Sequence, residues 1–425
     1  MRNTGTTRRT FVRQIAVAGV GFTTAMPAVI PASVLGAGRP APSDRISLAC
    51  IGVGGQGARV DLKAYLSLPN AQVVAVCDVD SRRLAAAKKT VDRAYANRDC
   101  ASYRDFREVM IRDDIDAVHI ATPDHWHVPI AVAACKHGKD VYCQKPLSLT
   151  VREARQAVRV ARRYARVFQM GTQNRSNASA RLACELVRNG RLGELKFIEV
   201  GTWHISQPCS LPAQPVPPHV DWEMFLGPAP WRPFHSAIQR PKGWIRFIDY
   251  SGGGVTDCGA HFFDLVQWAL GTEDTGPVEI TPLDPRRSGG RFVRYRYANG
   301  ATVYRTNGNH MRLVGSLGTI DLGACAWASI TKTTPTDLAR STIGLGEVHL
   351  RESVNHYANF LECVRTREKP AADVELGCRA ATICHIGNIA EWLGRPLRWN
   401  PDKEEFVGDQ AANRWLDRAK REPWL

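Results

Sequence analysis

The 425-residue sequence predicts an α/β chain, in which a doubly wound parallel sheet is followed by a second domain with a larger sheet. Three observations carry this prediction. Short apolar runs alternate with helical stretches between Arg45 and Thr172. A glycine-rich turn follows the first apolar run, Ile46 to Ile51. Beyond residue 172 several segments alternate with a period of two, which is typical of strands with one buried face.

The composition favours a globular enzyme, since 44% of the residues are hydrophobic and 23% are charged. The formal net charge is +15, but the basic residues are scattered and form no nucleic-acid-binding motif, so we expect no nucleic-acid partner. The twelve cysteines include no C-x-x-C pair and are interpreted mainly as reduced core thiols. A disulfide stays open for an exported protein, and no metal site is predicted.

Residues 1–42 are predicted to be a signal and linker that precede the fold. The segment from Thr7 to Arg13 contains the twin arginines Arg8 and Arg9, and a mild apolar run follows over residues 15–30. This pattern predicts export by the twin-arginine translocase (Tat) to the periplasm or an equivalent space of the cell envelope. Cleavage and retention as an anchor are both open, and a basic tail is the alternative interpretation.

The glycine-rich turn has the G-x-G-x-x-G pattern between a strand and a helix expected over residues 58–66. In order, it reads Gly52, Val53, Gly54, Gly55, Gln56 and Gly57. Gly52 permits the tight turn, Gly54 lets backbone approach a pyrophosphate, and Gly57 lets the helix sit close to the strand. The helix N-terminus then presents free N–H groups to the phosphates.

A second apolar strand, Val73 to Asp78, ends in an acid about twenty residues after the last glycine of the turn. A carboxylate there accepts hydrogen bonds from ribose hydroxyls and repels a 2′-phosphate, so NAD is favoured over NADP despite the nearby Arg82 and Arg83. Outside the cytoplasm no free NAD pool exists, so the cofactor is expected to be tightly bound. The turn and the acid together predict a Rossmann nucleotide-binding domain over residues 45–172.

Two further strands of this domain end in polar segments. The strand at 117–121 leads into Thr122, Pro123 and His127, and the strand at 141–143 leads into Gln144 and Lys145. Because the carboxyl ends of parallel strands meet at one edge of a sheet, these residues are expected to share a crevice with the glycine turn. Helices are expected over 81–95, 103–112 and 128–137, and from Thr150 onward with a Thr-x-x-Glu capping box.

The second domain is predicted over residues 173–399. Strands are expected at 195–203 and in a hairpin that turns at Asn299-Gly300, and helices at 177–189, 353–366 and 376–393. The proline-rich segment 208–218 is expected to be a loop, with a lid over the crevice as one interpretation. The aromatic residues that follow are either packing residues or a platform for a sugar ring: Trp222, Trp231, Phe234 and Trp244.

A glycine run at 252–254 leads into Asp257 and His261, which lie one helical turn apart. An exposed carboxylate–imidazole pair at a helix start can act as an acid/base unit, since histidine titrates near neutral pH. A structural His–Asp pair in a capped helix is the alternative.

The glycine turn, Asp78, Thr122-Pro123 with His127, and Lys145-Pro146 together resemble the glucose–fructose oxidoreductase/inositol dehydrogenase/MocA family. The resemblance implies a Rossmann domain followed by an α/β domain on a large open, mostly antiparallel sheet, and activity on sugars or polyols. The family signature is Glu-Lys-Pro, whose lysine takes part in proton transfer. Gln144 replaces the glutamate here, so it keeps hydrogen-bonding capacity but contributes no charge.

The resemblance also implies roles for the second domain: His261 as catalytic acid/base, with Asp257 beside it orienting its ring. Related secreted members often have a tryptophan and a second histidine where this chain has Cys258 and Phe262, which disfavours a metal site. The family's sheet packs against another subunit, so a homo-oligomer is expected. Asn359 and Arg379 are expected to hold the domains together, and residues 400–425 resemble the C-terminal extension of bacterial secreted members.

These features predict an exported NAD-dependent oxidoreductase acting on a sugar, sugar acid or cyclitol. Hydride transfer to or from nicotinamide would be accompanied by proton transfer through Lys145 and His261. The alternative is an NAD-dependent glycoside hydrolase or lyase that works through a transient keto-sugar with no net redox change. A non-catalytic sugar- or nucleotide-binding protein on the same scaffold is a third hypothesis.

Overall fold

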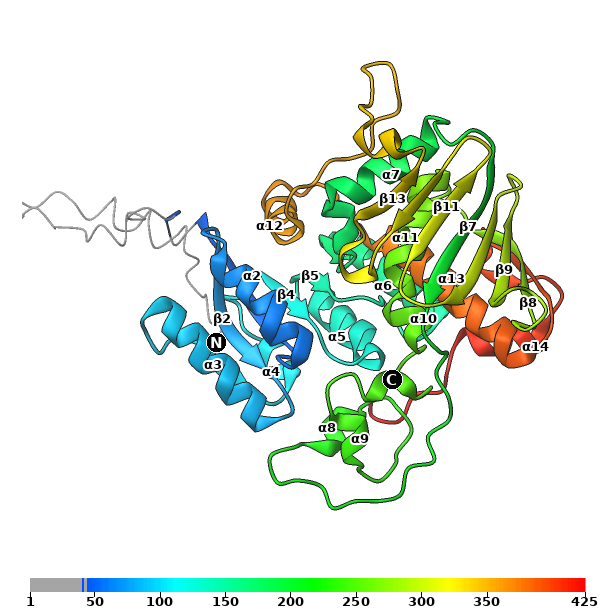
Figure 1. The fold of residues 1–425 in the computed structure, drawn as a ribbon. Coiled ribbons are helices and arrows are strands. Elements are labelled where there is room, and N and C mark those ends of the chain that lie inside the picture. Colours follow the sequence, from blue (N-terminus) through cyan, green and yellow to red (C-terminus); the bar gives the residue numbers. More distant parts are fainter. Residues whose placement is uncertain (1–39, 42–43, 425) are drawn as a thin grey trace, which may run out of the picture. The chain divides into compact units, whose positions relative to one another are not determined.

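Two sheets, one of six strands and one of nine, organise the chain (Figure 1). The computed structural model describes residues 40–41 and 44–424, so the expected signal and linker, residues 1–42, lies almost wholly outside the described residues. The chain from Ile46 onward forms one compact unit. Within the described residues, no helix has both the length and the apolar character that crossing a membrane requires.

The first sheet is parallel throughout and has the strand order β3-β2-β1-β4-β5-β6. The order reverses between β1 and β4, which makes the crevice above these two strands the ligand site expected for a doubly wound sheet. The predicted α/β class is therefore confirmed for this half. The strands are β1 Ile46–Ile51, β2 Ala71–Cys77, β3 Ala101–Tyr103, β4 Ala117–Ile120, β5 Asp140–Cys143 and β6 Phe168–Met170.

Helices connect these strands, and local capping explains where several of them begin. The Asp80 side chain accepts the backbone N–H groups of Arg82 and Arg83 at the start of α3. Thr150 caps α6 as predicted, since its hydroxyl accepts the N–H of Glu153. The helical segments are a π-helix over Gly57–Asp61 followed by α2 Leu62–Ser67, then α3 Ser81–Tyr95, α4 Phe106–Met110, α5 Asp124–Lys136 and α6 Val151–Arg163.

The second sheet has the order β13-β12-β11-β7-β10-β9-β8-β14-β15 and is antiparallel except where β10 pairs with β7. The predicted hairpin is confirmed, because Tyr295 pairs with Val303 across the turn at Asn299-Gly300. The strands are β7 Leu195–Thr202, β8 Pro277–Pro282, β9 Arg291–Tyr297, β10 Thr302–Asn307, β11 Met311–Gly315, β12 Thr319–Leu322, β13 Ile330–Thr334, β14 Leu397–Asn400 and β15 Glu405–Phe406.

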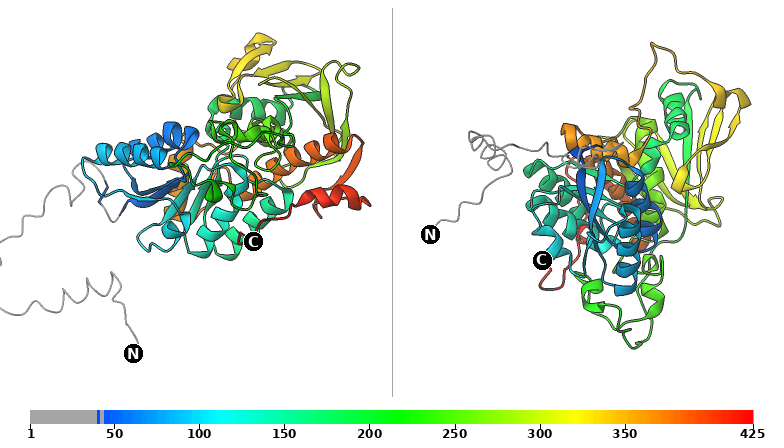
Figure 2. Two further views of the ribbon diagram at one scale, coloured as in Figure 1. Left: turned by 90° about the horizontal axis from the view of Figure 1, so that it is seen from below. Right: turned by 90° about the vertical axis from the view of Figure 1, so that its left-hand side faces the viewer.

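Helices cover one face of this sheet, and Figure 2 shows its strands as an outer layer of the molecule. Phe262, Phe263 and Leu265 of α11 pack in the largest core cluster together with inward-facing strand residues such as Val200 and Tyr295. The helices of this half are α7 Ala178–Arg188, α8 Trp222–Leu226, α9 Ser236–Gln239, α10 Gly254–Asp257, α11 Gly259–Leu270, α12 His356–Thr366, α13 Val374–Leu393 and α14 Gln410–Asn413.

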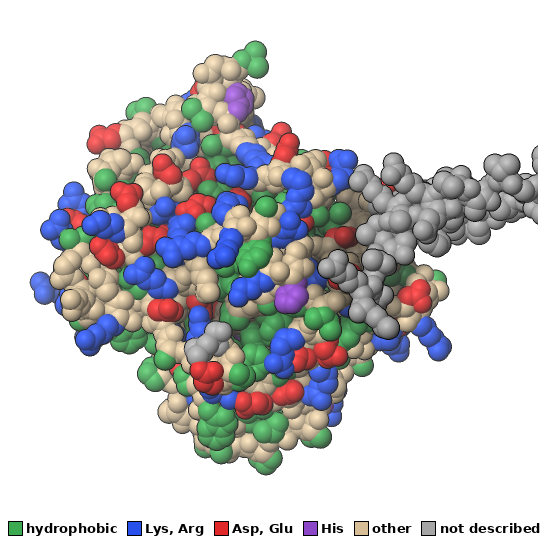
Figure 3. All heavy atoms as spheres, turned by 180° about the vertical axis from the view of Figure 1, so that it is seen from behind, with side chains coloured by type: hydrophobic (Ala, Val, Ile, Leu, Met, Phe, Trp, Pro, Cys, Tyr) green, Lys and Arg blue, Asp and Glu red, His purple; other side chains and the backbone are tan. Residues whose placement is uncertain are grey.

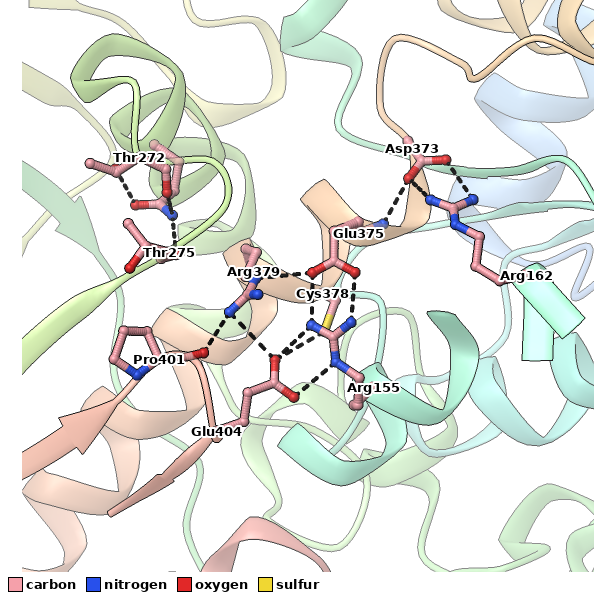
Figure 4. A network of polar contacts seen from close by, with 11 residues as sticks. Arg155, Arg162, Thr272, Thr275, Asp373, Glu375, Cys378, Arg379, Pro401 and Glu404 are labelled. Carbon is pink, nitrogen blue, oxygen red and sulfur yellow. Dashed lines mark hydrogen bonds and ion pairs between the residues drawn. The ribbon is translucent and has the colours of Figure 1, made fainter. Parts of the chain in front are cut away.

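An ion-pair network joins α6 of the parallel sheet to α13 and to the C-terminal segment (Figure 4). The guanidinium of Arg155 donates to both oxygens of Glu375, at 2.6 and 2.8 Å, and to both oxygens of Glu404, at 2.8 and 2.7 Å. Arg379 donates to Glu375 and to the carbonyl of Pro401. Arg379 thus ties α13 to the C-terminal segment, whereas the contact with the first domain, which Arg379 was expected to make, comes from Arg155.

The aromatic residues after the proline-rich loop mostly pack against one another. Trp222, Phe225, Phe234 and Tyr250 are buried in a separate small core, so the packing interpretation holds for these residues. Trp231, by contrast, is 64% exposed. The proline-rich loop ends beside the parallel sheet, since the N–H of Ser81 donates to the carbonyl of His219 at 2.9 Å.

Lysine and arginine side chains are interspersed with aspartate and glutamate on the face drawn in Figure 3, as their scatter along the sequence predicts. No single basic stripe crosses this face. Positive and negative side chains are therefore mixed on this face.

Candidate active site

A cavity of about 830 Å³ runs from the glycine turn to the second domain. It is lined by every predicted site residue except Gly57 and His261: Gly52, Val53, Gly54, Gly55, Gln56, Asp78, Thr122, Pro123, His127, Gln144, Lys145 and Asp257. The residues come from the carboxyl ends of β1, β2, β4 and β5 and from α10. The expected shared crevice is therefore present.

The glycine turn has the shape that its sequence pattern requires. Gly52 has φ +82°, and a Cβ there would lie 2.6 Å from the carbonyl carbon of Ala121. A Cβ on Gly57 would lie 2.0 Å from the carbonyl oxygen of Gly52, so this glycine allows close packing and does not line the cavity. A Cβ on Gly55 would meet nothing within 4 Å, which leaves this side of the turn open toward the cavity.

The Asp78 carboxylate is tied to the glycine turn. Its Oδ2 accepts the N–H of Val53 at 2.9 Å, and its Oδ1 accepts the N–H of Asp80 at 2.9 Å. Burial raises the pKa of Asp78 to about 6, although these N–H groups and the Arg83 guanidinium partly oppose the shift. Asp78 is thus ionised at neutral pH and retains lone pairs for further donors.

The cavity fits a dinucleotide in three respects. Its glycine turn is open at Gly55, the carboxylate of Asp78 lines it beside that turn, and Thr122 offers a buried hydroxyl with no hydrogen-bond partner among the described residues. The side chains of Arg83 and Arg104 also line it. Backbone N–H groups of the turn, Asp78 and the Thr122 hydroxyl are the groups that would hold a pyrophosphate and a ribose there.

His127 connects two of the strand-end loops. Its Nε2 lies 2.9 Å from the carbonyl oxygen of Thr122, and its Nδ1 lies 2.6 Å from that of Pro146. Burial lowers the pKa of His127 to about 4, so the ring is neutral and donates only one of these two contacts as a hydrogen bond. Both ring nitrogens face protein carbonyls, which leaves the ring itself as the part that lines the cavity.

Gln144 belongs to a buried polar cluster that the sequence did not reveal. Its Nε2 donates to Oδ1 of Asp61 at 2.9 Å, and the same oxygen accepts Nε2 of Gln56 at 3.0 Å and the hydroxyl of Tyr357 at 2.5 Å. The ring of His119 lies against the other oxygen, with Nε2 at 3.1 Å from Oδ2. The glutamine at this signature position thus contacts a carboxylate that stands behind the cavity wall.

Lys145 and Asp257 meet across the two domains. The Lys145 ammonium donates to Oδ1 of Asp257, while Lys242 donates to Oδ2 at 3.3 Å. Burial raises the pKa of Asp257, but the two ammonium groups outweigh it and bring the pKa down to about 2. Burial lowers the pKa of Lys145, but the charges of Asp257 and Asp124 outweigh it and hold this pKa above its usual value. Asp257 therefore supplies, beside the Lys145 ammonium, the negative charge that Gln144 lacks.

His261 differs from its expected arrangement in two ways. The pair is buried and not exposed, with Asp257 6% and His261 3% accessible. Asp257 also gives both oxygens to lysines, so the expected hydrogen bond that orients His261 is not formed. The reason is that α10 ends at Asp257 and α11 begins at Gly259, while Lys145 reaches in from the other domain. Burial and the Lys145 charge lower the pKa of His261 to about 3, which keeps its ring neutral.

A second hollow, of about 590 Å³, opens on the other side of Asp257. Its lining includes Trp203, His204 and Arg246, and the Lys242 ammonium lies 5.8 Å from the ring centre of Trp203. Trp203 is 39% exposed. An aromatic face beside charged donors suits a polyhydroxylated ligand, and sequence reasoning missed both Trp203 and Lys242 because neither stands in a recognisable motif.

Two family models match this chain. The one described as "Oxidoreductase family, NAD-binding Rossmann fold" matches residues 46–172, and the one described as "Oxidoreductase family, C-terminal alpha/beta domain" matches residues 194–425. The second match alone covers more than half of the chain. The chain therefore belongs to the Gfo/Idh/MocA oxidoreductase family, and its first sheet is an NAD-binding Rossmann domain.

Among curated proteins, the chain is 31% identical over 207 residues to a "Glycosyl hydrolase family 109 protein" of Saccharopolyspora erythraea, which covers 45% of this chain and 44% of that one. It is 29% identical over 161 residues to an "Alpha-N-acetylgalactosaminidase" of Shewanella oneidensis, and the match covers 36% of this chain and 34% of that one. The chain thus spans less than half the length of these relatives. A solved structure of the WlbA dehydrogenase from Bordetella pertussis, in complex with NADH and UDP-GlcNAcA, has a TM-score of 0.58 at 17% identity, covering 84% of this chain and 99% of that one.

Proposed function

We propose that this protein is an NAD-dependent enzyme that oxidises or reduces a hydroxyl-bearing carbon of a sugar, sugar acid or cyclitol. One observation carries the proposal: Lys145 of the parallel sheet and Asp257 of the second domain form an ion pair in the cavity that begins at the glycine turn. A substrate in the hollow beside Trp203 would reach this ion pair, because Asp257 lines both spaces.

A bound nicotinamide would supply the hydride acceptor or donor. Lys145 carries the positive charge that binds a substrate hydroxyl oxygen and stabilises it as it loses its proton. His261 is neutral and can accept a proton, whereas Lys145 is kept protonated by Asp257. The proposed division is thus Lys145 as electrostatic stabiliser and proton donor, His261 as proton acceptor, and Asp257 as the group that fixes Lys145.

The test is a panel of sugars, sugar acids and cyclitols offered to the purified protein with NAD, monitored by NADH absorbance. The Lys145→Met variant is expected to lose at least about 1000-fold in kcat while it retains NAD binding. Lys196→Met, on a strand of the second sheet outside both cavities, is the matched control and should leave kcat unchanged. Full activity of Lys145→Met, or failure to bind NAD, would contradict the proposal.

A glycoside hydrolase or lyase is the second candidate, favoured by the names of the two curated relatives. In this reaction a sugar carbon is oxidised, and the aglycone takes up a proton and leaves by elimination from the transient keto-sugar. In a hydrolase water then adds to the resulting double bond, whereas in a lyase the double bond remains; the hydride returns to the carbonyl carbon in both. Aryl glycosides separate the candidates, since release of the aryl alcohol without net NADH formation indicates the hydrolase or lyase. Net NADH accumulation without that release indicates the oxidoreductase.

The proposed cofactor is NAD, tightly bound, rather than NADP. Asp78 supports this choice because its carboxylate at the ribose end would repel a 2′-phosphate. Arg83 and Arg104 line the same cavity, and their positive charges would attract a 2′-phosphate. Titration calorimetry with both nucleotides, together with mass spectrometry of nucleotide released from the purified protein, tests the preference.

The proposed assembly is a homo-oligomer that packs through the outer face of the second sheet. Phe197 and Tyr304 stand half-buried on this face, with the Arg291 guanidinium 4.9 and 4.0 Å from their ring centres. Light scattering should report a multiple of the 47.0 kDa chain mass, and Tyr304→Glu should reduce the measured mass.

Export by Tat is likewise proposed, on the twin arginines alone. Replacing Arg8 and Arg9 by lysine should retain the protein in the cytoplasm.

A further inference from the structure

Two cysteine thiols lie together beside the ion pair of the active site. Cys258 occupies the break between α10 and α11, and Cys325 begins a short 3-10 helix, Cys325–Trp327. Oδ1 of Asn309 holds both, because it accepts the Cys258 thiol at 3.2 Å and the backbone N–H of Cys325 at 2.7 Å. The shared acceptor thus brings the Cys258 thiol and the backbone of Cys325 together. None of the twelve cysteines, all of which lie in the described part of the chain, is disulfide-bonded in this structure.

The surroundings make the two thiols unequal. The interaction with Cys258 and the charge of Lys145 lower the pKa of Cys325, although burial opposes them. The same interaction raises the pKa of Cys258, and burial adds to this increase. Burial raises the pKa of other core thiols, Cys184 among them. Cys325 is thus the thiol with the greater thiolate character, and Cys258 is its protonated neighbour.

We propose that Cys258 and Cys325 form a peroxide-driven disulfide that switches the active site off. The Cys325 thiolate attacks one oxygen of hydrogen peroxide, the O–O bond breaks, and the hydroxide that leaves takes up a proton to become water. The Cys258 sulfur then attacks the resulting sulfenic acid, the S–O bond breaks, and a second water leaves with the Cys258 proton. Two thiols lose two electrons in total, and one peroxide is reduced to two waters.

The link acts on the site through the residue next to Cys258. Asp257 precedes Cys258 directly and holds Lys145, so drawing the Cys258 sulfur into a bond with Cys325 shifts the carboxylate away from the ammonium. Lys145 then loses the partner that keeps it charged and placed. A dithiol reductant reverses the change, because thiol–disulfide exchange regenerates both cysteines.

Mass spectrometry of the folded full chain tests the link without any substrate. Trypsin places each cysteine alone in its peptide, residues 247–286 and 313–332, so a disulfide gives one defined peptide pair. Hydrogen peroxide followed by alkylation should yield this pair, and dithiothreitol should remove it. Peroxide-treated protein in which both cysteines remain alkylated, or in which Cys325 is oxidised without linkage, would overturn the proposal.

Variants separate the switch from general oxidative damage. Cys258→Ser and Cys325→Ser should each abolish the linked pair, whereas Cys184→Ser, a buried thiol on α7, should leave it intact. Once a substrate is found, inactivation by peroxide should be at least about tenfold slower in Cys325→Ser. Equal inactivation of Cys325→Ser and the unmodified chain would show that the disulfide does not control activity, whatever reaction the enzyme catalyses.

Discussion

Burial and neighbouring charges fix the protonation states of Lys145, Asp257 and His261 before any substrate binds. Asp257 is ionised and Lys145 protonated, because each stabilises the charge of the other. His261 is neutral at every pH well above 3. The low pKa of the His261 imidazole thus comes from burial and from the neighbouring ammonium.

Nucleotide affinity should depend on the protonation of Asp78. Its pKa is about 6, raised by burial, so the carboxylate that accepts ribose hydroxyls is lost as the pH falls through 6. A hydrogen bond to a charged acceptor is worth about 1 kcal/mol more than one to a neutral acceptor, so NAD should bind about five- to tenfold more weakly at pH 5 than at pH 7.5. Titration calorimetry across this range measures the change.

The matched variant for this prediction is Asp78→Asn, whose NAD affinity should be low and nearly independent of pH. The free energy of unfolding should change with pH in the opposite direction to NAD affinity. A carboxyl whose pKa is raised in the folded state stabilises that state at low pH and loses this contribution as the pH rises from about 4 to 6. Parallel thermal unfolding of the nucleotide-free protein separates the two effects. An unchanged pH dependence in Asp78→Asn would assign the titration to another group.

Gln144 and Asp61 should behave as one unit on mutation. Gln144→Glu places a second carboxylate against Oδ1 of Asp61 and should destabilise the fold by about 2 kcal/mol, since two buried like charges repel. The double variant Asp61→Asn/Gln144→Glu restores an amide–carboxylate pair with the roles exchanged. Denaturant unfolding of both single variants and the double variant should give a coupling energy of about 1–2 kcal/mol. Additive changes would mean that the two side chains do not interact.

The predicted site residues were those that stand in local motifs, and the missed ones were joined to them only by folding. The glycine turn, Asp78 and Lys145 each follow a strand, and strand ends converge in a parallel sheet. Asp61 contacts Gln144 across 83 positions and Tyr357 across 296, separations at which sequence patterns carry no signal. The expected contact of Asp257 with His261 failed for the same reason, because Lys145 and Lys242 take the carboxylate.

The glycine turn and the helix after it share one close contact. Gly57 lets the first helical turn approach the backbone of Gly52, and the π-helical geometry over Gly57–Asp61 places Asp61 toward the buried cluster. Because the phosphate-binding N–H groups belong to this same segment, packing and nucleotide binding depend on the same few residues.

Gly57→Ala should destabilise the nucleotide-free protein by about 2 kcal/mol or more, because its Cβ would overlap the carbonyl oxygen of Gly52. Gly55→Ala is the control, since its Cβ would meet no atom within 4 Å. Thermal unfolding of both variants without nucleotide measures the difference. Equal melting temperatures would show that the helix shifts to accommodate the methyl group.

Elements with strong local signals were predicted to the residue, while weakly marked ones were not. Helix α3 was expected over residues 81–95 and is found there, because Asp80 caps it and its apolar residues recur at helical spacing. Strand β3, only three residues at the sheet edge, has no alternation to reveal it. Helix α5 begins at Asp124, four residues before its predicted start. Hydrogen bonds from His125 and Trp126 to backbone carbonyls of α8 support this first turn.

The Arg155 network links the nucleotide-binding half to the C-terminal segment of the chain. Arg155 sits on α6, while its partners Glu375 and Glu404 come from α13 and from the segment before β15. The two domains thus share a polar contact at residues that do not line the cavity and that no sequence motif marked.

Arg155→Met should lower the free energy of unfolding by about 3 kcal/mol, because it removes four hydrogen bonds to two mostly buried carboxylates and leaves Arg379 as their one remaining cation among the described residues. Arg159→Met on the same helix is the control, since that side chain is exposed and should change stability by less than about 0.5 kcal/mol. Urea unfolding measures both. A drop of similar size in the two variants would mean that the network contributes nothing specific.

The two lysines that contact Asp257 differ greatly in solvent exposure. We therefore expect a bound ligand hydroxyl to replace the more exposed lysine on the carboxylate. The Lys242 side chain is 69% exposed, whereas that of Lys145 is 17% exposed. Dissolved ions screen the outer contact and leave the inner one almost untouched. Raising the ionic strength should therefore release Lys242 first and free one carboxylate oxygen for an incoming hydroxyl. A Michaelis constant that responds to salt in the unmodified chain but not in Lys242→Met would be the kinetic signature of that exchange.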